Sequence, residues 1–486
     1  MAKSKTPSYT LTLPLKIEPY QEYILNKRFE KCRKMYNSCL GEALKRYNHM
    51  IESKQYKKIK KVKDEKLRNK RYEECNEEYG LTKKSFQKFV NSMYNYFGLE
   101  SKTAQNQSHK AFATIQKLMF HKAKRVNFIK YNELISVQAL DNRQGVTYRD
   151  GYIVWMKTKF PVIIKNNDLY AQKAIQDRVK LCRILKKEIK GKTKFYAQLI
   201  LEGIPPKKNN KEIGEVKGRT GNGKVGIDIG TRTIAISSKY DVKLLELAPN
   251  INNIDKEIKL IQRKMDRSKR SMNPSKFNED GTIKRGNRDR WIYSNKYLKA
   301  KALRKELFRK QTELRKQDHY NMINWLLALG NKFYVEDMNY QGLQKRVKKT
   351  TINEETKRFN KKKRFGKSLA NKAPSMFLTM LDNKLKYNDE KLYKIDTKKC
   401  KCSQYNHFTD EFSKKELKDR WNKDIVIQRD MYSSFLIMNV NEDLKSVNRE
   451  KCIETYDNFK TLHDKEINRL RELKKNGHKL ISSMGI

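Results

Sequence analysis

Acidic residues are scarce in this chain of 486 residues, where 55 Asp and Glu face 110 Lys and Arg and leave a formal net charge of +55. An isolated protein with this imbalance repels itself, and bound counter-anions relieve the repulsion. A nucleic acid is the natural counter-anion, because contacts to its phosphates dominate affinity. A genome rich in Lys codons would explain a preference for Lys over Arg, but not the deficit of acids. The composition therefore predicts a nucleic-acid-binding protein.

Long apolar runs and a disulfide framework are also missing. No run reaches the roughly 18 apolar residues of a membrane-spanning helix, and the first residues, Met1 to Thr6, lack the apolar core of a signal peptide. The seven cysteines are odd in number and widely scattered, which argues against a set of structural disulfides. We therefore expect a cytosolic protein with no membrane segment.

The length predicts about two to four domains, and the periodicity of apolar residues indicates where they lie. Apolar residues alternate from Ser8 to Ile17, as in a half-buried strand, and helical spacing then follows until a period of two returns near Asn127. The expected divisions are 1–19 and 127–204 (a β-rich domain), 20–126 (a helical domain inserted in it), 205–223 (a linker), 224–394 and 428–486 (an α/β domain) and 395–427 (an insert in that domain).

Asp228 is the first of three carboxylates that occupy comparable positions in distant segments. It lies between Ile227 and Ile229 in an apolar strand, so alternation places the isoleucines on one face and Asp228 on the other, beside Gly226 and Gly230. We expect these glycines to leave room for a metal ion and a phosphate to approach the backbone.

Glu336 and Asp430 complete the set. Glu336 ends the short strand predicted at 332–336, where a buried segment would reach the surface. Asp430 opens a stretch with small residues at Ser433 and Ser434, which predicts a helix packed closely on a sheet with its first acid pointing outward. Asp337 follows Glu336 directly and would point the opposite way if the strand continued, so we do not expect it to be a ligand.

Three carboxylates within a few ångströms of one another raise each other's pKa and require a compensating cation. Two Mg²⁺ ions, with Mn²⁺ as a possible substitute, would meet this need, because hard divalent cations prefer oxygen ligands. One ion would lower the pKa of a bound water to make the nucleophile, and the other would stabilise the leaving 3′-oxygen. The set therefore predicts hydrolysis of phosphodiester bonds.

At these residues the chain resembles the RuvC-containing RNA-guided nucleases, which are the transposon-encoded TnpB proteins and the miniature type V-F CRISPR effectors. The three segments that carry the resemblance are VGIDIGTRTIAIS, FYVEDMN and RDMYSSFLI, and the family's catalytic positions fall on Asp228, Glu336 and Asp430. A further segment, AQNQSHKAFATIQKLMFHKAKRVNF, resembles the basic helical segment that precedes the family's wedge domain.

The resemblance implies an α/β multidomain protein with a RuvC (RNase H-like) nuclease domain, a β-barrel wedge domain that holds guide RNA, and an inserted helical recognition lobe. It implies a Mg²⁺-dependent, RNA-guided DNA endonuclease of antiviral defence in the prokaryotic cytosol. Its partners would be a guide RNA and double- and single-stranded target DNA, with an asymmetric homodimer as a possible assembly. The helical lobe is longer than is usual for TnpB, which favours a CRISPR effector.

Two alternatives stay open beside this reading. One is a TnpB-type transposon nuclease. The other is a guide-dependent DNA-binding protein with weak or no cleavage, because the superfamily includes nuclease-dead regulators. The intact set of three acids favours cleavage.

The chain departs from the family where a CxxC…CxxC zinc ribbon is usual. Cys400 and Cys402 are followed by Tyr405 and His407, and no second cysteine pair precedes Asp430. Structural zinc takes four N or S ligands, and this segment supplies at most three at poor spacing. We therefore expect the insert at 395–427 to be a small metal-free fold, with Phe408, Phe412 and Trp421 as its core.

Aromatic residues in the basic regions have two possible roles. Tyr56, Tyr72, Phe86 and Tyr131 could stack on exposed bases. The other interpretation, that they pack between helices, is favoured here.

Overall fold

The structure, a computed structural model, describes residues 6–207, 220–347, 349, 351–354, 360, 365–414, 416, 419–422 and 424–486. Most of the linker predicted at 205–223 lies outside the described residues. The chain forms two compact units, Met1–Pro206 and Lys207–Ile486. It is a mixed α/β protein with more than one unit, as predicted.

Unit 1 contains two antiparallel sheets. The larger sheet has the order β1-β7-β6-β2 and the smaller one β3-β4-β5. The strands are β1 (Ser8–Pro14), β2 (Ser136–Gln138), β3 (Thr147–Arg149), β4 (Tyr152–Trp155), β5 (Thr158–Pro161), β6 (Val179–Ile189) and β7 (Lys192–Glu202). Among the described strands the sheets do not close into a barrel, so the expected β-barrel is not present in that form.

Helices lie between β1 and β2 in the sequence, although β1 pairs with β7 along its whole length. They are α1 (Pro19–Glu52), α2 (Lys54–Ile59), α3 (Glu65–Glu78), α4 (Lys83–Asn91) and α5 (Ser101–Met119), with α6 (Leu169–Ala174) following β5. The long helix α1 begins at a capping box formed by Glu18 and Gln21, which satisfies two of the free N–H groups at its start.

The apolar stripe of α1 forms the centre of unit 1. Phe29 packs edge-to-face on Trp155 and Phe195, with ring centroids 6.3 and 6.1 Å apart, and so joins the helix to both sheets. Cys32 and Cys39 are free thiols buried in the same stripe. Their spacing in the sequence, every three or four residues with the other apolar residues of the helix, predicts core positions, and the structure confirms this prediction.

The four aromatic residues that could either stack on bases or pack between helices differ in their burial. Tyr56 and Phe86 are buried in a helical core cluster, and Tyr72 packs against it. Tyr131 is 78 % exposed. Packing therefore accounts for three of the four, and Tyr131 keeps a ring that a base could reach.

Unit 2 is built on a five-stranded sheet of order β10-β9-β8-β11-β12. Strands β8, β9 and β10 are antiparallel neighbours, whereas β11 and β12 run parallel to β8. The bounds are β8 (Lys224–Ile229), β9 (Thr233–Ser238), β10 (Val242–Glu246), β11 (Lys332–Glu336) and β12 (Leu392–Ile395). The strands predicted around Asp228 and at 332–336 are confirmed.

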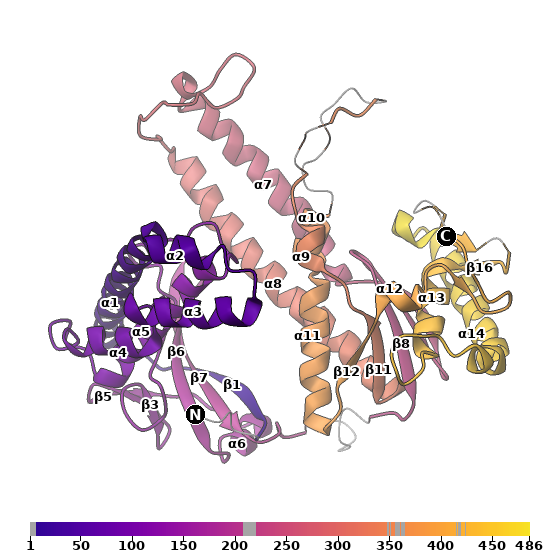
Figure 1. Cartoon of the computed structure of the whole chain (residues 1–486), viewed down its shortest axis with the longest axis horizontal. Coiled ribbons are helices and arrows are strands. Elements are labelled where there is room, and N and C mark those ends of the chain that lie inside the picture. The colour runs from indigo at the N-terminus through magenta and orange to yellow at the C-terminus, as the bar shows by residue number, and fades with distance from the viewer. Residues whose placement is uncertain are drawn as a thin grey trace. The chain divides into compact units, whose positions relative to one another are not determined.

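Helices cover both faces of this sheet (Figure 1). The α-helices of unit 2 are α7 (Asn252–Ser271), α8 (Asn295–Leu329), α9 (Tyr340–Leu343), α10 (Gly366–Lys372), α11 (Pro374–Leu385), α12 (Thr397–Cys400), α13 (Arg429–Met438) and α14 (Arg449–Lys475). Helices α8 and α11 pack on the face that carries Val225, Ile227 and Ile229. Helices α13 and α14 pack on the opposite face, against residues such as Leu244 and Tyr334.

The segment between β10 and β11 forms a long hairpin of α7 and α8 (Figure 1). The sequence predicts one helical section at 254–329 with a break near 273–287, and the helices end at Ser271 and resume at Asn295. At the break, the Lys269 and Lys276 ammonium groups lie 3.7 and 4.9 Å from the Trp291 ring centroid. Among the described helices, none has the length and hydropathy needed to cross a bilayer.

The insert contains two small two-stranded sheets, β13 (Tyr405–Asn406) with β14 (Glu411–Phe412) and β15 (Trp421–Asn422) with β16 (Ile427–Gln428). Its expected aromatic core is wrong in part, because Phe408 and Phe412 are 43 % and 53 % exposed. Its buried apolar residues include Cys400, Cys402, Tyr405 and Ile427, which join the core under α13.

Candidate active site and nucleic-acid interface

Asp228 and Glu336 are brought together by the register of two parallel strands. Strand β11 pairs with β8 so that Val335 lies opposite Ile227. One residue further along, Glu336 therefore lies opposite Asp228, and neighbouring strands are about 4.8 Å apart. Both carboxylates thus lie at the carboxyl ends of adjacent strands near the centre of the sheet.

Asp430 reaches the same place from the helix above the sheet. A Cβ added to Gly226 would lie 2.0 Å from the Ser434 carbonyl oxygen and 2.5 Å from the Met438 nitrogen, so α13 rests directly on β8 at this glycine. Asp228 is two residues beyond Gly226 on the same face of the strand, and Asp430 is one turn before Ser434 on the same side of the helix. The two acids are therefore directed to one end of the contact.

This packing corrects the expected role of Gly226. The sequence predicts that Gly226 leaves room for a metal ion, whereas in the structure it leaves room for a helix. The predicted helix with small residues is confirmed, since Ser433 and Ser434 are buried. The Ser434 and Ser237 hydroxyls lie 2.6 Å apart and join α13 to β9 as well.

The electrostatics of the site follow from this convergence. Burial raises the pKa of Asp228 well above its usual value, and the like charges of Asp430 and Glu336 raise it further. Burial also raises the pKa of Glu336. Arg429 and Arg420 act in the opposite direction on the pKa of Asp228. Asp430 and Glu336 are therefore close enough to Asp228 to oppose its ionisation.

Two arginines approach the carboxylate of Asp430. Arg429 Nη2 lies 3.3 Å from Oδ1, and Arg420 Nη1 lies 3.7 Å from Oδ2. The Asp430 side chain is 16 % exposed. Its negative charge is thus partly compensated from within the protein.

The residues fit a hard divalent cation by their chemistry, because three carboxylates at one end of a sheet supply oxygen ligands. Within the described part of the chain, no three His, Cys, Asp or Glu side chains stand in an arrangement that could hold a metal ion. A bound cation would therefore have to ionise Asp228, whose pKa is raised, and to draw Asp430 away from its ion pairs with the two arginines.

Tyr340 is a member of this site that none of the three sequence motifs includes. Burial raises the pKa of its phenol, and the charges of Asp228 and Glu336 raise it further. Its hydroxyl is buried and has no hydrogen-bond partner among the described residues. Its place four residues after Glu336, at the start of α9, was the available signal.

Asp337 is directed elsewhere. Its side chain is 64 % exposed and forms an ion pair with Lys394, with 3.0 Å between the Oδ1 and Nζ atoms. Strand β11 ends at Glu336, so the change of direction coincides with the end of the ladder.

Cys400 and Cys402 lie close enough to the acids for the charge of Glu336 to act on both thiols, whereas His407 packs elsewhere in the core. A hydrogen bond between the two thiols lowers the pKa of Cys400 and raises that of Cys402. The charge of Glu336 adds to the rise at Cys402 and opposes part of the fall at Cys400. His407 Nδ1 lies 2.6 Å from the Tyr432 hydroxyl. Burial, and then the charge of Arg449, lowers the pKa of His407 to about 4. His407 is therefore a neutral core residue at pH 7.

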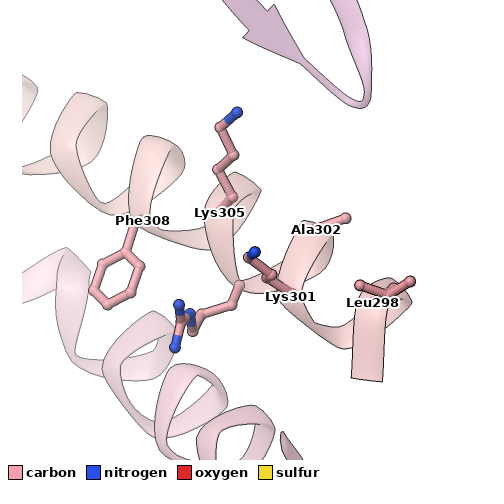
Figure 2. A pocket seen from close by; sticks show the side chains of 6 residues that line it. Leu298, Lys301, Ala302, Lys305 and Phe308 are labelled. Carbon is pink, nitrogen blue, oxygen red and sulfur yellow. The ribbon is translucent and has the colours of Figure 1, made fainter. Parts of the chain in front are cut away.

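A basic hollow on α8 is the second candidate region. It has a volume of about 400 Å³ and is lined by Leu298, Lys301, Ala302, Arg304, Lys305 and Phe308. Figure 2 shows the side chains of Lys301, Lys305 and Phe308 projecting from consecutive turns of the helix. Phe308 is 42 % exposed, so the hollow combines cations with an accessible ring, as polynucleotide-binding surfaces do.

Comparisons with known proteins find similarity to solved structures, among them two complexes of Cas12f. No protein-family model matches the sequence, and no curated protein matches it. A cryo-EM structure of a Cas12f1–sgRNA–target DNA complex is similar at 10 % identity and a TM-score of 0.42, over 89 % of this chain and 98 % of that chain. A CRISPR-Cas12f ternary complex is similar at 12 % identity and a TM-score of 0.26, over 87 % of this chain and 83 % of that chain.

Both structure neighbours are thus complexes of Cas12f, the type V-F group that the three sequence motifs resemble. Both TM-scores lie below 0.5. The chemistry of this chain therefore has to follow from its own residues.

Proposed function

We propose that this chain is a Mg²⁺-dependent, RNA-guided DNA endonuclease of the CRISPR type V-F kind, which hydrolyses phosphodiester bonds of target DNA after the guide RNA has paired with it. The observation that carries the proposal is the convergence of Asp228, Glu336 and Asp430. They come from three motifs more than ninety residues apart in the sequence, and the charges of Asp430 and Glu336 both act on the pKa of Asp228.

The three carboxylates would hold the cations, and each is placed by a different element. Asp228 and Glu336 are fixed by the pairing of β8 with β11, and Asp430 by the contact of α13 with Gly226. When bound, divalent cations supply an activated water and stabilise the leaving oxygen of the phosphodiester. The phenol of Tyr340 has a raised pKa, so it stays protonated at neutral pH and can donate a hydrogen bond to a group beside the acids.

The basic surfaces would hold the guide RNA and the DNA. The net charge of +55 requires a polyanionic partner, and the hollow on α8 offers lysines and a phenyl ring on one face. Sequence choice would come from base pairing, while the protein would hold the backbone of the RNA–DNA heteroduplex.

The test begins with the RNA that copurifies with the protein, because its sequence supplies the guide. The complex of Asp228→Asn with that RNA should bind matched DNA but cleave it at least about a hundredfold more slowly, the scale of losing one electrostatic stabiliser. Asp337→Asn is the matched control, since Asp337 is an adjacent acid paired with Lys394, and it should cleave normally. Undiminished cutting by Asp228→Asn would refute the assignment of this acid.

A guide-dependent DNA-binding protein with weak or no cleavage is the second candidate function. The ion pairs of Asp430 with Arg420 and Arg429 favour it, because they engage one of the three acids. The wild-type complex distinguishes the two functions, since it would bind matched DNA and leave it intact in the presence of Mg²⁺ if this candidate were correct.

A further inference from the structure

The two arginines at Asp430 differ in how firmly they are held. Arg429 donates through Nη1 to the carbonyl oxygens of Glu416 and Asp419, at 3.2 and 3.0 Å, and its side chain is 13 % exposed. The Arg420 side chain is 29 % exposed. Within the described residues its guanidinium forms no ion pair or hydrogen bond other than the 3.7 Å ion pair with Asp430.

The backbone of Arg420 is fixed even though its guanidinium is not. Its carbonyl oxygen accepts a hydrogen bond from the backbone N–H of Arg429 at 2.9 Å, and the side chain of the next residue, Trp421, donates through Nε1 to the Gly485 carbonyl oxygen at 2.8 Å. A Cβ added to Gly485 would lie 2.3 Å from the Arg420 Cβ. Only the end of the side chain is therefore free to leave Asp430.

A guanidinium and a divalent cation compete for the same carboxylate. A Mg²⁺ ion binds its oxygen ligands at about 2.0–2.1 Å, and a guanidinium beside those oxygens repels it because both are cations. Arg429 contacts Oδ1 and is held by two carbonyls, whereas Arg420 faces Oδ2 with no second anchor. Oδ2 is therefore the oxygen of Asp430 that a divalent cation can bind at the lower cost in free energy.

We propose that Arg420 is a positioning residue that pairs with Asp430 and competes with a divalent cation for its carboxylate, so that the metal binds Asp430 only when the Arg420 side chain swings away. The inference rests on the proposed function, because it assumes that Asp430 is a metal ligand. A purely structural role, in which Arg420 ties the insert to α13, gives the opposite expectation: loss of the ion pair would loosen Asp430 and weaken metal binding.

The experiment is a titration of the full-length, RNA-free protein with Mn²⁺, in which the free ion is measured by electron paramagnetic resonance. Arg420→Gln should bind Mn²⁺ about two- to five-fold more tightly than the wild type, the size expected for losing a partly exposed ion pair. Arg420→Lys keeps the charge and should bind as the wild type does. Lys332→Gln removes one positive charge at the far end of β11 and should leave the affinity unchanged.

The outcomes distinguish a wrong role for Arg420 from the absence of a metal site at Asp430. Unchanged or weaker Mn²⁺ binding by Arg420→Gln would overturn the inference, provided that Asp430→Asn binds Mn²⁺ more weakly than the wild type. Equal binding by Asp430→Asn and wild type would overturn the metal site itself, and the inference with it. Equal tightening by Lys332→Gln and Arg420→Gln would also overturn the inference, because it would reduce the effect to net charge.

Discussion

At the scale of single residues, the candidate site is a concentration of three carboxylates, of which Asp228 and Glu336 have pKa values raised by burial. Asp228 has its pKa raised first by burial and then by Asp430 and Glu336, so the three acids cannot all ionise at no cost. Two arginines offset part of this charge at Asp430. A divalent cation would offset it more fully, which explains why residues that oppose one another are found together.

A buried histidine gives a prediction for the pH dependence of stability. Burial lowers the pKa of His407 to about 4 in the folded protein, against about 6.5 when unfolded. Between these values the unfolded chain binds the extra proton, so stability should fall as the pH drops from about 6.5 to about 4, by up to about 1.4 kcal/mol per pH unit. His407→Phe should remove this contribution.

Thermal unfolding of both proteins between pH 7 and pH 5 measures the effect. The comparison is one of slopes, because His407→Phe also loses the contact with the Tyr432 hydroxyl and so changes stability at every pH. His407→Phe should lose less stability than the wild type over this range. Equal losses in the two proteins would show that His407 titrates normally.

At the scale of elements, the position of Asp430 depends on the contact between β8 and α13. Gly226→Ala would place a Cβ 2.0 Å from the Ser434 carbonyl oxygen, and backbone atoms cannot turn aside as a flexible side chain can. We expect the variant to lose about 1–3 kcal/mol of stability, the usual cost of overpacking, and to lose cleavage because Asp430 moves away from Asp228.

Chemical denaturation and a cleavage assay check this prediction. Gly41→Ala is the matched control, because a Cβ at Gly41 in α1 would meet only the Phe128 ring at 3.9 Å, and alanine favours a helix. It should be as stable as the wild type or slightly more so. Wild-type stability and cleavage in Gly226→Ala would contradict the proposed dependence of Asp430 on this contact.

Elements with a strong local pattern could be predicted from the sequence. The alternation around Asp228 and the break between α7 and α8 both depend on neighbouring residues, and the structure has them where the pattern places them. The convergence of Asp228 and Glu336 was expected from the resemblance, whereas its cause, the parallel pairing of β8 and β11, is a long-range contact that no local pattern contains.

The sequence does not predict the core of the insert or the role of Arg420, because both depend on contacts between distant segments. Phe408 and Phe412 were expected to form the core of the insert because they are its large apolar residues. The insert instead buries Cys400 and Cys402 against α13, since the neighbouring helix supplies the apolar surface. Arg420 was missed for a related reason: an arginine in a basic chain carries no signal until folding sets it beside Asp430.

At the scale of the whole molecule, the excess of positive charge should govern binding to RNA. If the protein neutralises about six phosphates or more, its affinity for the copurified RNA should fall by about three orders of magnitude or more between 50 and 200 mM salt. Filter-binding titrations at several salt concentrations measure this slope. A flat response would mean that phosphate contacts do not provide the affinity, and the +55 charge would then need another explanation.

The central claim is that Asp228, Glu336 and Asp430 bind cations as one site, and iron-mediated cleavage of the protein tests it most directly. Fe²⁺ that replaces Mg²⁺ in the presence of ascorbate and peroxide generates radicals that cut the nearby backbone, and mass spectrometry locates the cuts. The account predicts cuts in all three segments around these residues at once, which excess Mg²⁺ suppresses. Cuts confined to one segment, or gathered instead around Cys400 and His407, would contradict it.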